Sequence, residues 1–171
     1  CSSDGTKKLF QEFADNNDFY DCKVLSNPKK VLPAGWNVAL DNADGQIIVR
    51  VDAHARIPDD FIEANVKNID SGEDIVGGQR ITIFDNTTRW KGALAAAESS
   101  AFGSGIAVYR RKFERGYTKT LAHAAYRKSV FDTVGRYNEA LKRTEDNDMH
   151  YRMRKAGFKL CMCDDIVSYH H

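Results

Sequence analysis

The sequence predicts an α/β fold in which a mainly parallel, mixed sheet is flanked by helices. Strand-like and helix-like segments alternate through the first half of the chain, which is the pattern of such a sheet. Hydrophobic residues make up 42% of the 171 residues, enough for one sizeable core. The run QIIVRV at 46–51 is the strongest strand pattern, and helix signals follow it.

The elements of the first half are bounded by proline and glycine. Pro33 and Pro58 stand in the first turns of two helices, where proline needs no amide hydrogen, and Gly45 ends the first of these. In chain order we expect a helix over 7–14, a strand over 22–28, a helix from 33, a strand over 46–51 and a helix over 58–69.

The second half is less regular, and residues 99–126 show no clean period. Gly77-Gly78 indicates a bulge within a strand, and Thr144 can cap a helix. We expect a strand over 74–84, helices over 90–98, 127–135 and 145–155, and strands over 158–163 and 165–171. In sheets of this kind, ligands bind beyond the carboxyl ends of the strands.

Composition excludes some function classes. The net charge of +1 gives no field that selects for nucleic acid or an anionic membrane, so we expect no nucleic-acid partner. No apolar run reaches the roughly 18–20 residues that span a bilayer. The four cysteines form no C-x-x-C pair, which favours a reduced, cytoplasmic protein.

Asp52-Ala53-His54 follows the strand over 46–51. On an extended backbone, Asp52 and His54 would point to the same side, because side chains alternate. A carboxylate with an imidazole suits Mn²⁺ better than Ca²⁺, and Mg²⁺ is also compatible. The alternative is a strand-to-helix turn with His54 at the surface, and spacing alone favours that turn.

Acidic residues also crowd the start of the helix over 145–155. Glu145, Asp146 and Asp148 can complement the helix dipole, with Asp148 paired to Arg152, or one carboxylate can serve as a general base. The terminal His170 and His171 could be tag residues, a frayed end or metal ligands, while His123 and His150 show no visible partner.

Several stretches occur here in the order of a known family: SSDGT (2–6), NPKKVLPAGWNVAL (27–40), DGQIIVRVDAHARIPDDFIEA (44–64), AAYRKSVFDTVGRYNEAL (124–141) and RTEDNDMHYRMRKAGFKL (143–160). Together they resemble the family 2 glycosyltransferases, an inverting class with the GT-A (nucleotide-diphospho-sugar transferase) fold. The resemblance is greatest to bacterial exopolysaccharide members of the succinoglycan type.

The resemblance implies transfer of a sugar from a nucleotide-diphosphate donor, commonly a UDP-sugar. The acceptor would be a saccharide or lipid-linked hydroxyl in polysaccharide or glycolipid synthesis. Asp146 would be the general base, and Glu145 would orient the helix start or the acceptor. The remaining implied contacts are Asn37 at the nucleotide and Mg²⁺ or Mn²⁺ held by Asp52, His54 and His170 or His171.

The chain departs from the family pattern in two ways. The usual D-x-D is Asp52-Ala53-His54, which still suits a metal. The family's first strand, helix and second strand have no counterpart, so we expect residues 1–171 to be one partial GT-A-like catalytic domain that is inactive alone. The full-length protein would be cytoplasmic, at the inner face of the membrane through regions outside this chain.

Two rival functions remain open on the sequence. A nucleotidyltransferase can share the sheet and the use of a metal ion, although transfer to a phosphate needs no general base on the helix over 145–155. A non-catalytic sugar-nucleotide-binding domain of the same fold is the other.

Overall fold

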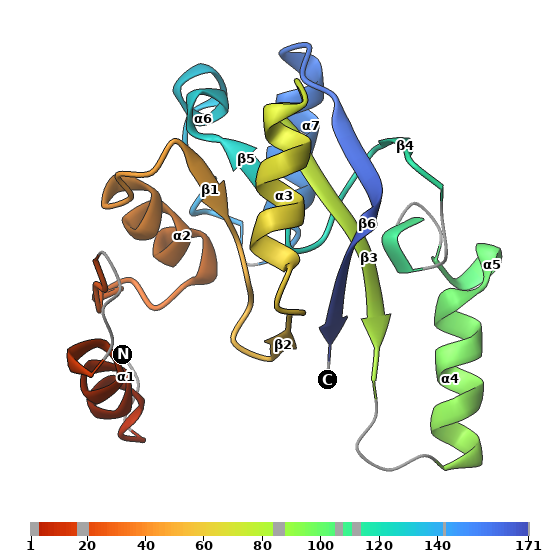
Figure 1. The fold of residues 1–171 in the computed structure, drawn as a ribbon, viewed down its shortest axis with the longest axis horizontal. Helices are drawn as coiled ribbons and strands as arrows, with labels where there is room; N and C mark the ends of the chain where they lie inside the picture. Colours follow the sequence, from red (N-terminus) through yellow and green to blue (C-terminus); the bar gives the residue numbers. More distant parts are fainter. Residues whose placement is uncertain are drawn as a thin grey trace. The chain divides into compact units, whose positions relative to one another are not determined.

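The computed structural model describes residues 4–16, 21–83, 88–104, 108–110, 114–141 and 143–170 (Figure 1). Contacts divide the chain into two compact units. The first unit comprises Cys1–Ala43 and Tyr137–Glu145, and the second comprises Asp44–Arg136 and Asp146–His171. The sheet belongs to the second unit.

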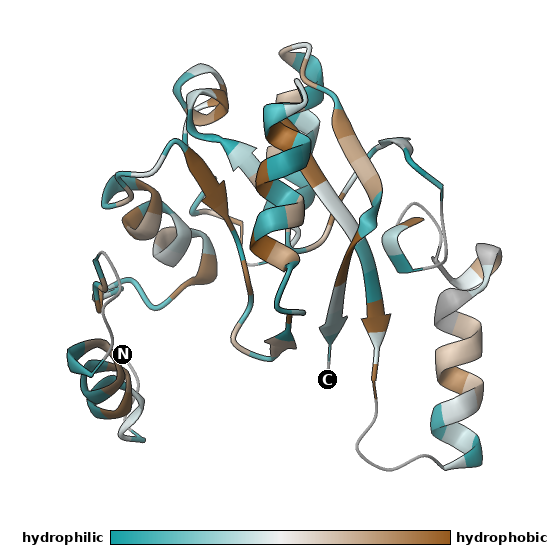
Figure 2. Cartoon of the chain, in the orientation of Figure 1, coloured by the Kyte–Doolittle hydropathy of each residue, from teal (hydrophilic) through white to brown (hydrophobic). Residues whose placement is uncertain are grey.

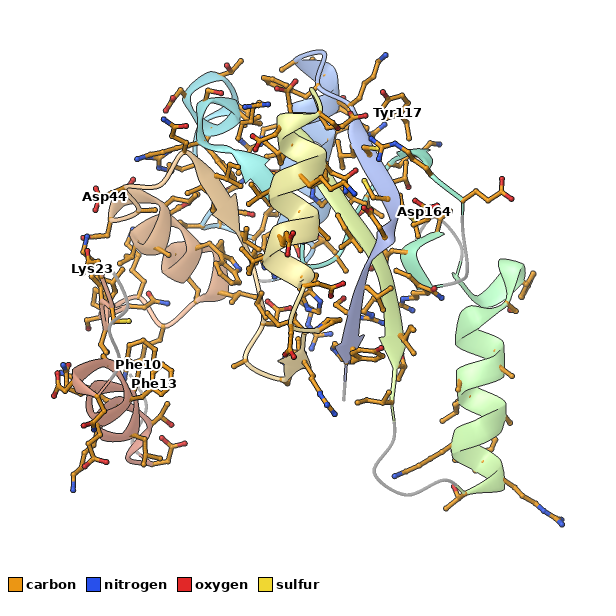
Figure 3. The ribbon with its side chains drawn as sticks, in the orientation of Figure 1. Phe10, Phe13, Lys23, Asp44, Tyr117 and Asp164 are labelled. Carbon is orange, nitrogen blue, oxygen red and sulfur yellow. The ribbon has the colours of Figure 1, made fainter. Side chains whose placement is uncertain are left out.

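The first unit contains two helices, α1 (Thr6–Asp15) and α2 (Leu32–Asp41). Both confirm the predicted helices, and α2 carries its proline in the first turn, but it ends at Asp41 and not at Gly45 as predicted. Figure 3 shows Phe10 and Phe13 on α1, and both are exposed. The prediction of a strand over 22–28 is wrong. The described backbone there pairs with no other strand, so its apolar pattern does not lead to a hydrogen-bonded strand pair.

The second unit contains one six-stranded sheet with the order β1-β5-β3-β6-β2, and β4 also pairs with β6. Its strands are β1 (Ile47–Val49), β2 (Ala55–Arg56), β3 (Ile75–Thr82), β4 (Gly116–Thr118), β5 (Ala125–Arg127) and β6 (Leu160–His170). The β3–β6 pair is parallel, and the pairs β1–β5, β3–β5, β2–β6 and β4–β6 are antiparallel.

The sheet is mixed, as expected, but has fewer parallel neighbours than the sequence predicts. The pairings make β1, β3 and β6 run in one direction, which agrees with the strand–helix alternation. β5 lies between β1 and β3 and runs the opposite way. β5 overlaps the end of the stretch 99–126, where no period is visible. The strand–helix alternation therefore indicated the direction of the strands but not which strands are neighbours.

Helices cover both faces of the sheet. The described helices of this unit are α3 (Phe61–Asp70), α4 (Arg89–Ser99), α5 (Ala101–Ser104), the 3₁₀ helix η1 (Val108–Arg110), α6 (Lys128–Val134) and most of α7 (Glu145–Lys155). On β5, Ala125 packs into the cluster under α3, whereas its neighbour Tyr126 contacts His150 of α7. Adjacent residues of a strand point to opposite faces, so α3 and α7 lie on opposite sides.

The core cluster under α3 joins that helix to the central strands. Its buried members are Phe61, Ile69, Val76, Ala125, Cys161, Cys163 and Ile166. Figure 2 shows hydrophobic residues along β1 and in β3, whereas polar residues follow β1.

Among the described residues, no helix combines the length and the apolar composition that crossing a bilayer requires.

The two strands predicted at the end of the chain form one strand, β6, so this prediction is corrected. Its register with β3 shifts between Gly77, which pairs with Met162, and Gln79, which pairs with Val167. An irregularity therefore lies at the predicted place, but the extra residues belong to β6 and not to Gly77-Gly78. A Cβ at Gly78 would lie 1.7 Å from the carbonyl oxygen of Ile166. This irregular part of β6 explains why the sequence pattern predicted two separate strands there.

Candidate active site

Asp52 lies just beyond the carboxyl end of β1. The amide of Arg50 still donates to the carbonyl of Ala124 (3.1 Å), which continues the pairing of β1 with β5. Residues 52–55 then form a turn, closed by the Ala55 amide donating to the Asp52 carbonyl at 2.9 Å. The extended backbone expected through Asp52 and His54 is therefore wrong: the turn alternative holds for the backbone.

This turn brings His54 to the end of β6. Because β2 pairs antiparallel with β6 in the register Ala55–His170, the residue before β2 lies beside the end of that strand. The Nε2 atoms of His54 and His170 are 2.8 Å apart, and the two rings meet edge to face at an interplanar angle of 84°. His171 lies outside the described residues.

Arg50 joins the two acidic stretches. Its Nε donates to Oδ1 of Asp52 at 3.2 Å, and its Nη1 donates to Oδ1 of Asp146. The side chain of Arg50 is 10% exposed, and those of Asp52 and Asp146 are 27% and 35% exposed. Both carboxylates therefore lie at the same place on the surface, and both remain open to solvent.

Two buried residues support Asp52 from the other side. Nε2 of His123 lies 3.6 Å from Oδ2 of Asp52, and its Nδ1 lies 2.9 Å from the hydroxyl of Ser168. The pKa of Asp52 is lowered to about 2, chiefly by His123, with a further contribution from Arg50 and against the effect of burial. No partner of His123 could be predicted from the sequence, because Ser168 and Asp52 are distant along the chain.

The electrostatic surroundings favour a neutral His170. Partial burial lowers the pKa of its imidazole, and the nearby cationic Arg80 lowers it further. A neutral imidazole keeps the lone pair that a metal ion needs.

Among the described residues, no three His, Cys, Asp or Glu side chains surround a single point as a metal site. The donor set nevertheless fits a divalent cation that accepts nitrogen and oxygen, such as Mn²⁺. Two imidazole nitrogens bound at right angles to one ion, each at about 2.1 Å, lie about 3 Å apart. The 2.8 Å between His54 and His170 is close to that separation. Asp52 follows β1, which runs in the same direction as β6, so Asp52 and His170 lie at the same end of the sheet.

The start of α7 separates a buried acid from an accessible one. Glu145 is 7% exposed, whereas the side chain of the next residue, Asp146, is 35% exposed. Thr144 does not cap the helix as predicted: it has a left-handed backbone (φ 64°), and its hydroxyl donates to the carbonyl of Arg143. The predicted pair is present, with Arg152 Nε donating to Oδ2 of Asp148 at 3.0 Å.

Asn37 belongs to the first unit and is buried there. Its amide donates to the carbonyl of Tyr137 and to Oε1 of Glu139, both at 3.0 Å, and its oxygen accepts from the Tyr137 amide at 2.8 Å. Lys29 in turn donates to Glu139. Both amide hydrogens of Asn37 are thus engaged, so these contacts support a structural role and give no support to the predicted nucleotide contact.

The fold and the sequence define a family. The chain has the mixed α/β architecture of GT-A glycosyltransferases, and residues 1–135 match the sequence profile of glycosyl transferase family 2. The chain therefore belongs to glycosyl transferase family 2, which confirms the resemblance found in the sequence.

Two curated relatives match almost the whole chain. The succinoglycan biosynthesis protein ExoA of Rhizobium meliloti (strain 1021) is 32% identical over 168 residues, covering 95% of this chain and 49% of the relative. The dolichyl N-acetyl-alpha-D-glucosaminyl phosphate 3-beta-D-2,3-diacetamido-2,3-dideoxy-beta-D-glucuronosyltransferase of Methanococcus voltae is 23% identical over 171 residues, covering 98% and 53%. The chain thus spans about half the length of these relatives.

Solved structures share the fold at low identity. TarS 1–349 of S. aureus in complex with UDP-GlcNAc aligns with a TM-score of 0.68 at 15% identity, covering 99% of this chain and 46% of TarS 1–349. GalNAc-T7 with UDP, GalNAc and Mn²⁺ aligns with a TM-score of 0.70 at 14% identity, covering 99% and 36%.

Proposed function

We propose that this chain is the catalytic GT-A-like domain, or part of it, of an inverting glycosyltransferase. The enzyme would move a sugar from a nucleotide-diphosphate donor, with UDP as the expected nucleotide, to a hydroxyl of a saccharide or lipid-linked acceptor. One observation carries the proposal: Asp52 and Asp146, from the two acidic stretches, contact the same guanidinium. Such a placement is what a donor site facing a base requires.

The relatives support the substrate class. One curated relative is named for succinoglycan biosynthesis and another as a glucuronosyltransferase, which fits polysaccharide or glycan assembly. Structures of the same fold hold UDP, UDP-GlcNAc, or UDP with Mn²⁺. These names support the UDP-sugar donor and the saccharide acceptor that we propose for this chain.

Asp146 is the proposed general base. An acceptor hydroxyl is a weak nucleophile, and a carboxylate within hydrogen-bond reach can take its proton as the oxygen attacks the anomeric carbon. The exposed part of Asp146 can receive the acceptor, while Arg50 holds Oδ1 and fixes the orientation of the carboxylate. Attack from the side opposite the diphosphate inverts the configuration. The buried Glu145 is proposed to orient the start of α7.

The opposite side of the reaction needs positive charge, because the diphosphate leaves as a polyanion. Asp52, His54 and His170 are the residues that would hold Mn²⁺ or Mg²⁺. When bound, such an ion supplies Lewis acidity at the phosphate oxygens. Arg50 and His123 keep the Asp52 carboxylate charged, since they lower its pKa to about 2.

Family membership favours glycosyl transfer over the nucleotidyltransferase alternative. The accessible Asp146 beside Asp52 also favours a catalytic domain over a binding domain, since a binding domain has no use for a base. Cys22, Cys161 and Cys163 are free thiols, which supports a reducing compartment and hence our proposal of a cytoplasmic enzyme. Association with the inner face of the membrane is proposed to depend on regions outside this chain.

The decisive experiment compares two carboxylates of α7 in the full-length protein. Asp146→Asn should lower kcat by about 10²–10⁴-fold, the usual contribution of a general base, while donor binding stays near normal. Asp148→Asn is the matched control, because Asp148 pairs with Arg152 on the same helix. Transfer to saccharide acceptors and UDP binding are measured for both. Substantial activity in Asp146→Asn would reject the base.

A further inference from the structure

Both oxygens of the Asp52 carboxylate face a nitrogen from the protein. Arg50 Nε lies 3.2 Å from Oδ1, and His123 Nε2 lies 3.6 Å from Oδ2. A carboxylate offers about four lone-pair positions, so these two neighbours leave room for a further partner. Held from two sides, the group is restricted in rotation about its Cβ–Cγ bond.

The contacts of His123 suit one tautomer of its ring. A carboxylate accepts and does not donate, so a hydrogen on Nε2, 3.6 Å from Oδ2 of Asp52, would point towards an acceptor. In that tautomer Nδ1 is an acceptor, and the Ser168 hydroxyl, 2.9 Å away, can donate to it. This tautomer matches the polarity of both neighbours of the ring.

His123 keeps this position at a conformational cost. Its φ is 44°, in the left-handed region that side chains other than glycine seldom adopt. Its side chain and that of Ser168 are buried. A residue in such a conformation is strained and persists where its surroundings demand it, often at a functional site.

β6 supplies both the support and a proposed ligand. Ser168 and His170 are two residues apart on this strand and therefore point to the same face. Ser168 meets His123, and His170 meets His54. A single strand thus positions both Ser168, which contacts His123, and His170, the proposed metal ligand that contacts His54.

His150 shows what a purely structural buried histidine looks like in the same unit. Its ring contacts the hydroxyls of Thr120 and Tyr126, at 3.1 and 3.0 Å, and neither is a proposed site residue. His123 differs because one of its two partners is Asp52. Both rings are buried and have two polar neighbours, so His150 is a matched control.

We propose that His123 is a positioning residue, with its tautomer set by Ser168, that orients the Asp52 carboxylate for a divalent cation. This inference rests on the cation site of the proposed function. Residues that orient a metal ligand in this way typically contribute 10–100-fold in metal affinity.

The test measures Mn²⁺ binding to the purified protein by electron paramagnetic resonance. His123→Asn suits the left-handed backbone, yet its side chain is too short to contact both Ser168 and Asp52. We expect its Mn²⁺ affinity to fall by about 10–100-fold, and that of Ser168→Ala by about tenfold. His150→Gln should bind Mn²⁺ as the unchanged protein does. If His123→Asn does not fold, Ser168→Ala decides the matter.

A second readout needs no metal. Nitrogen-15 NMR of the imidazole should show His123 protonated at Nε2 only, and Ser168→Ala should give a mixture of tautomers. Equal Mn²⁺ affinity of the His123 or Ser168 variants and the unchanged protein, or a proton on Nδ1, would overturn the inference. Absence of Mn²⁺ binding by the unchanged protein would instead reject the cation site itself, and with it this role for His123.

Discussion

The guanidinium of Arg50 contacts Asp52 through Nε and Asp146 through Nη1. One residue thus links the turn after β1 to the first turn of α7 across the sheet unit. Had the two carboxylates lain on opposite faces, or either one been closed off in an ion pair, the transferase proposal would have failed. Instead both are partly exposed around one shared cation.

Arg50→Gln should weaken both the fold and the reaction. The variant leaves two neighbouring carboxylates without their shared cation, and hydrogen bonds to charged groups contribute about 1.5–3 kcal/mol each. Because both carboxylates are partly exposed, we expect a loss of about 1–3 kcal/mol in total, measured by urea unfolding. Arg50→Lys keeps the charge but lacks the planar fork, so kcat should still fall.

The control for Arg50 is the exposed Arg56 on β2. Arg56→Gln should change the free energy of unfolding by no more than about 0.5 kcal/mol, as for an ordinary surface residue. If the two variants lose equal stability and activity, Arg50 has no special role in holding Asp52 and Asp146.

The sequence predicted much of the fold, because the signals that define it are local. Helices α1, α2, α3, α4, α6 and α7 and the strand β3 follow from apolar periods, proline and glycine. Segment 22–28 failed because a strand also needs a partner, which no local pattern supplies. β4 and β5 were not predicted, because each has only three residues and is defined by its pairing with another strand.

The candidate site could be predicted only in part. Asp52, His54 and Asp146 are proposed from their motif context, and the structure brings Asp52 and Asp146 to one guanidinium. Arg50 and His123 were missed, because their roles arise from contacts between residues far apart in the chain. One signal was available for Arg50: a cation at the end of an apolar strand predicts a nearby carboxylate partner.

His54 and His170 should act as a pair in cation binding. Their Nε2 atoms are 2.8 Å apart, so both would serve one ion. Each single change to Ala should weaken Mn²⁺ binding by at least about tenfold, and the double variant should lose less than the product of the two, because neighbouring residues are not additive. Calorimetric titration of the four proteins measures the coupling. Strictly additive losses would mean that the two histidines do not share an ion.

Gly78 and Gly92 should respond oppositely to alanine. A Cβ at Gly78 would lie 1.7 Å from the Ile166 carbonyl oxygen, and backbone atoms cannot move away cheaply, so Gly78→Ala should cost about 3 kcal/mol or more. A Cβ at Gly92, within α4, meets nothing within 4 Å, so Gly92→Ala should stabilise that helix by about 0.5–1 kcal/mol. Thermal unfolding measures both. A tolerated Gly78→Ala would contradict the close approach of β3 and β6.

His150 should make the protein sensitive to mild acid. Burial lowers the pKa of its imidazole to about 3 in the folded protein, below the ordinary value of 6.5. Between these values the unfolded chain binds a proton that the folded one does not. The stability linked to His150 is therefore fully present above pH 6.5 and falls by up to about 1.4 kcal/mol per pH unit towards pH 3.

The comparison with His150→Gln isolates this effect. A glutamine side chain does not titrate, so although the variant loses packing at pH 7, its free energy of unfolding should fall less steeply between about pH 6.5 and about pH 4. Asp52, with a pKa of about 2, loses its own contribution only at lower pH, below its ordinary value of 3.8. Urea unfolding at several pH values gives the two slopes, which should differ by about one proton. Parallel curves would show that His150 does not remain neutral inside the folded protein.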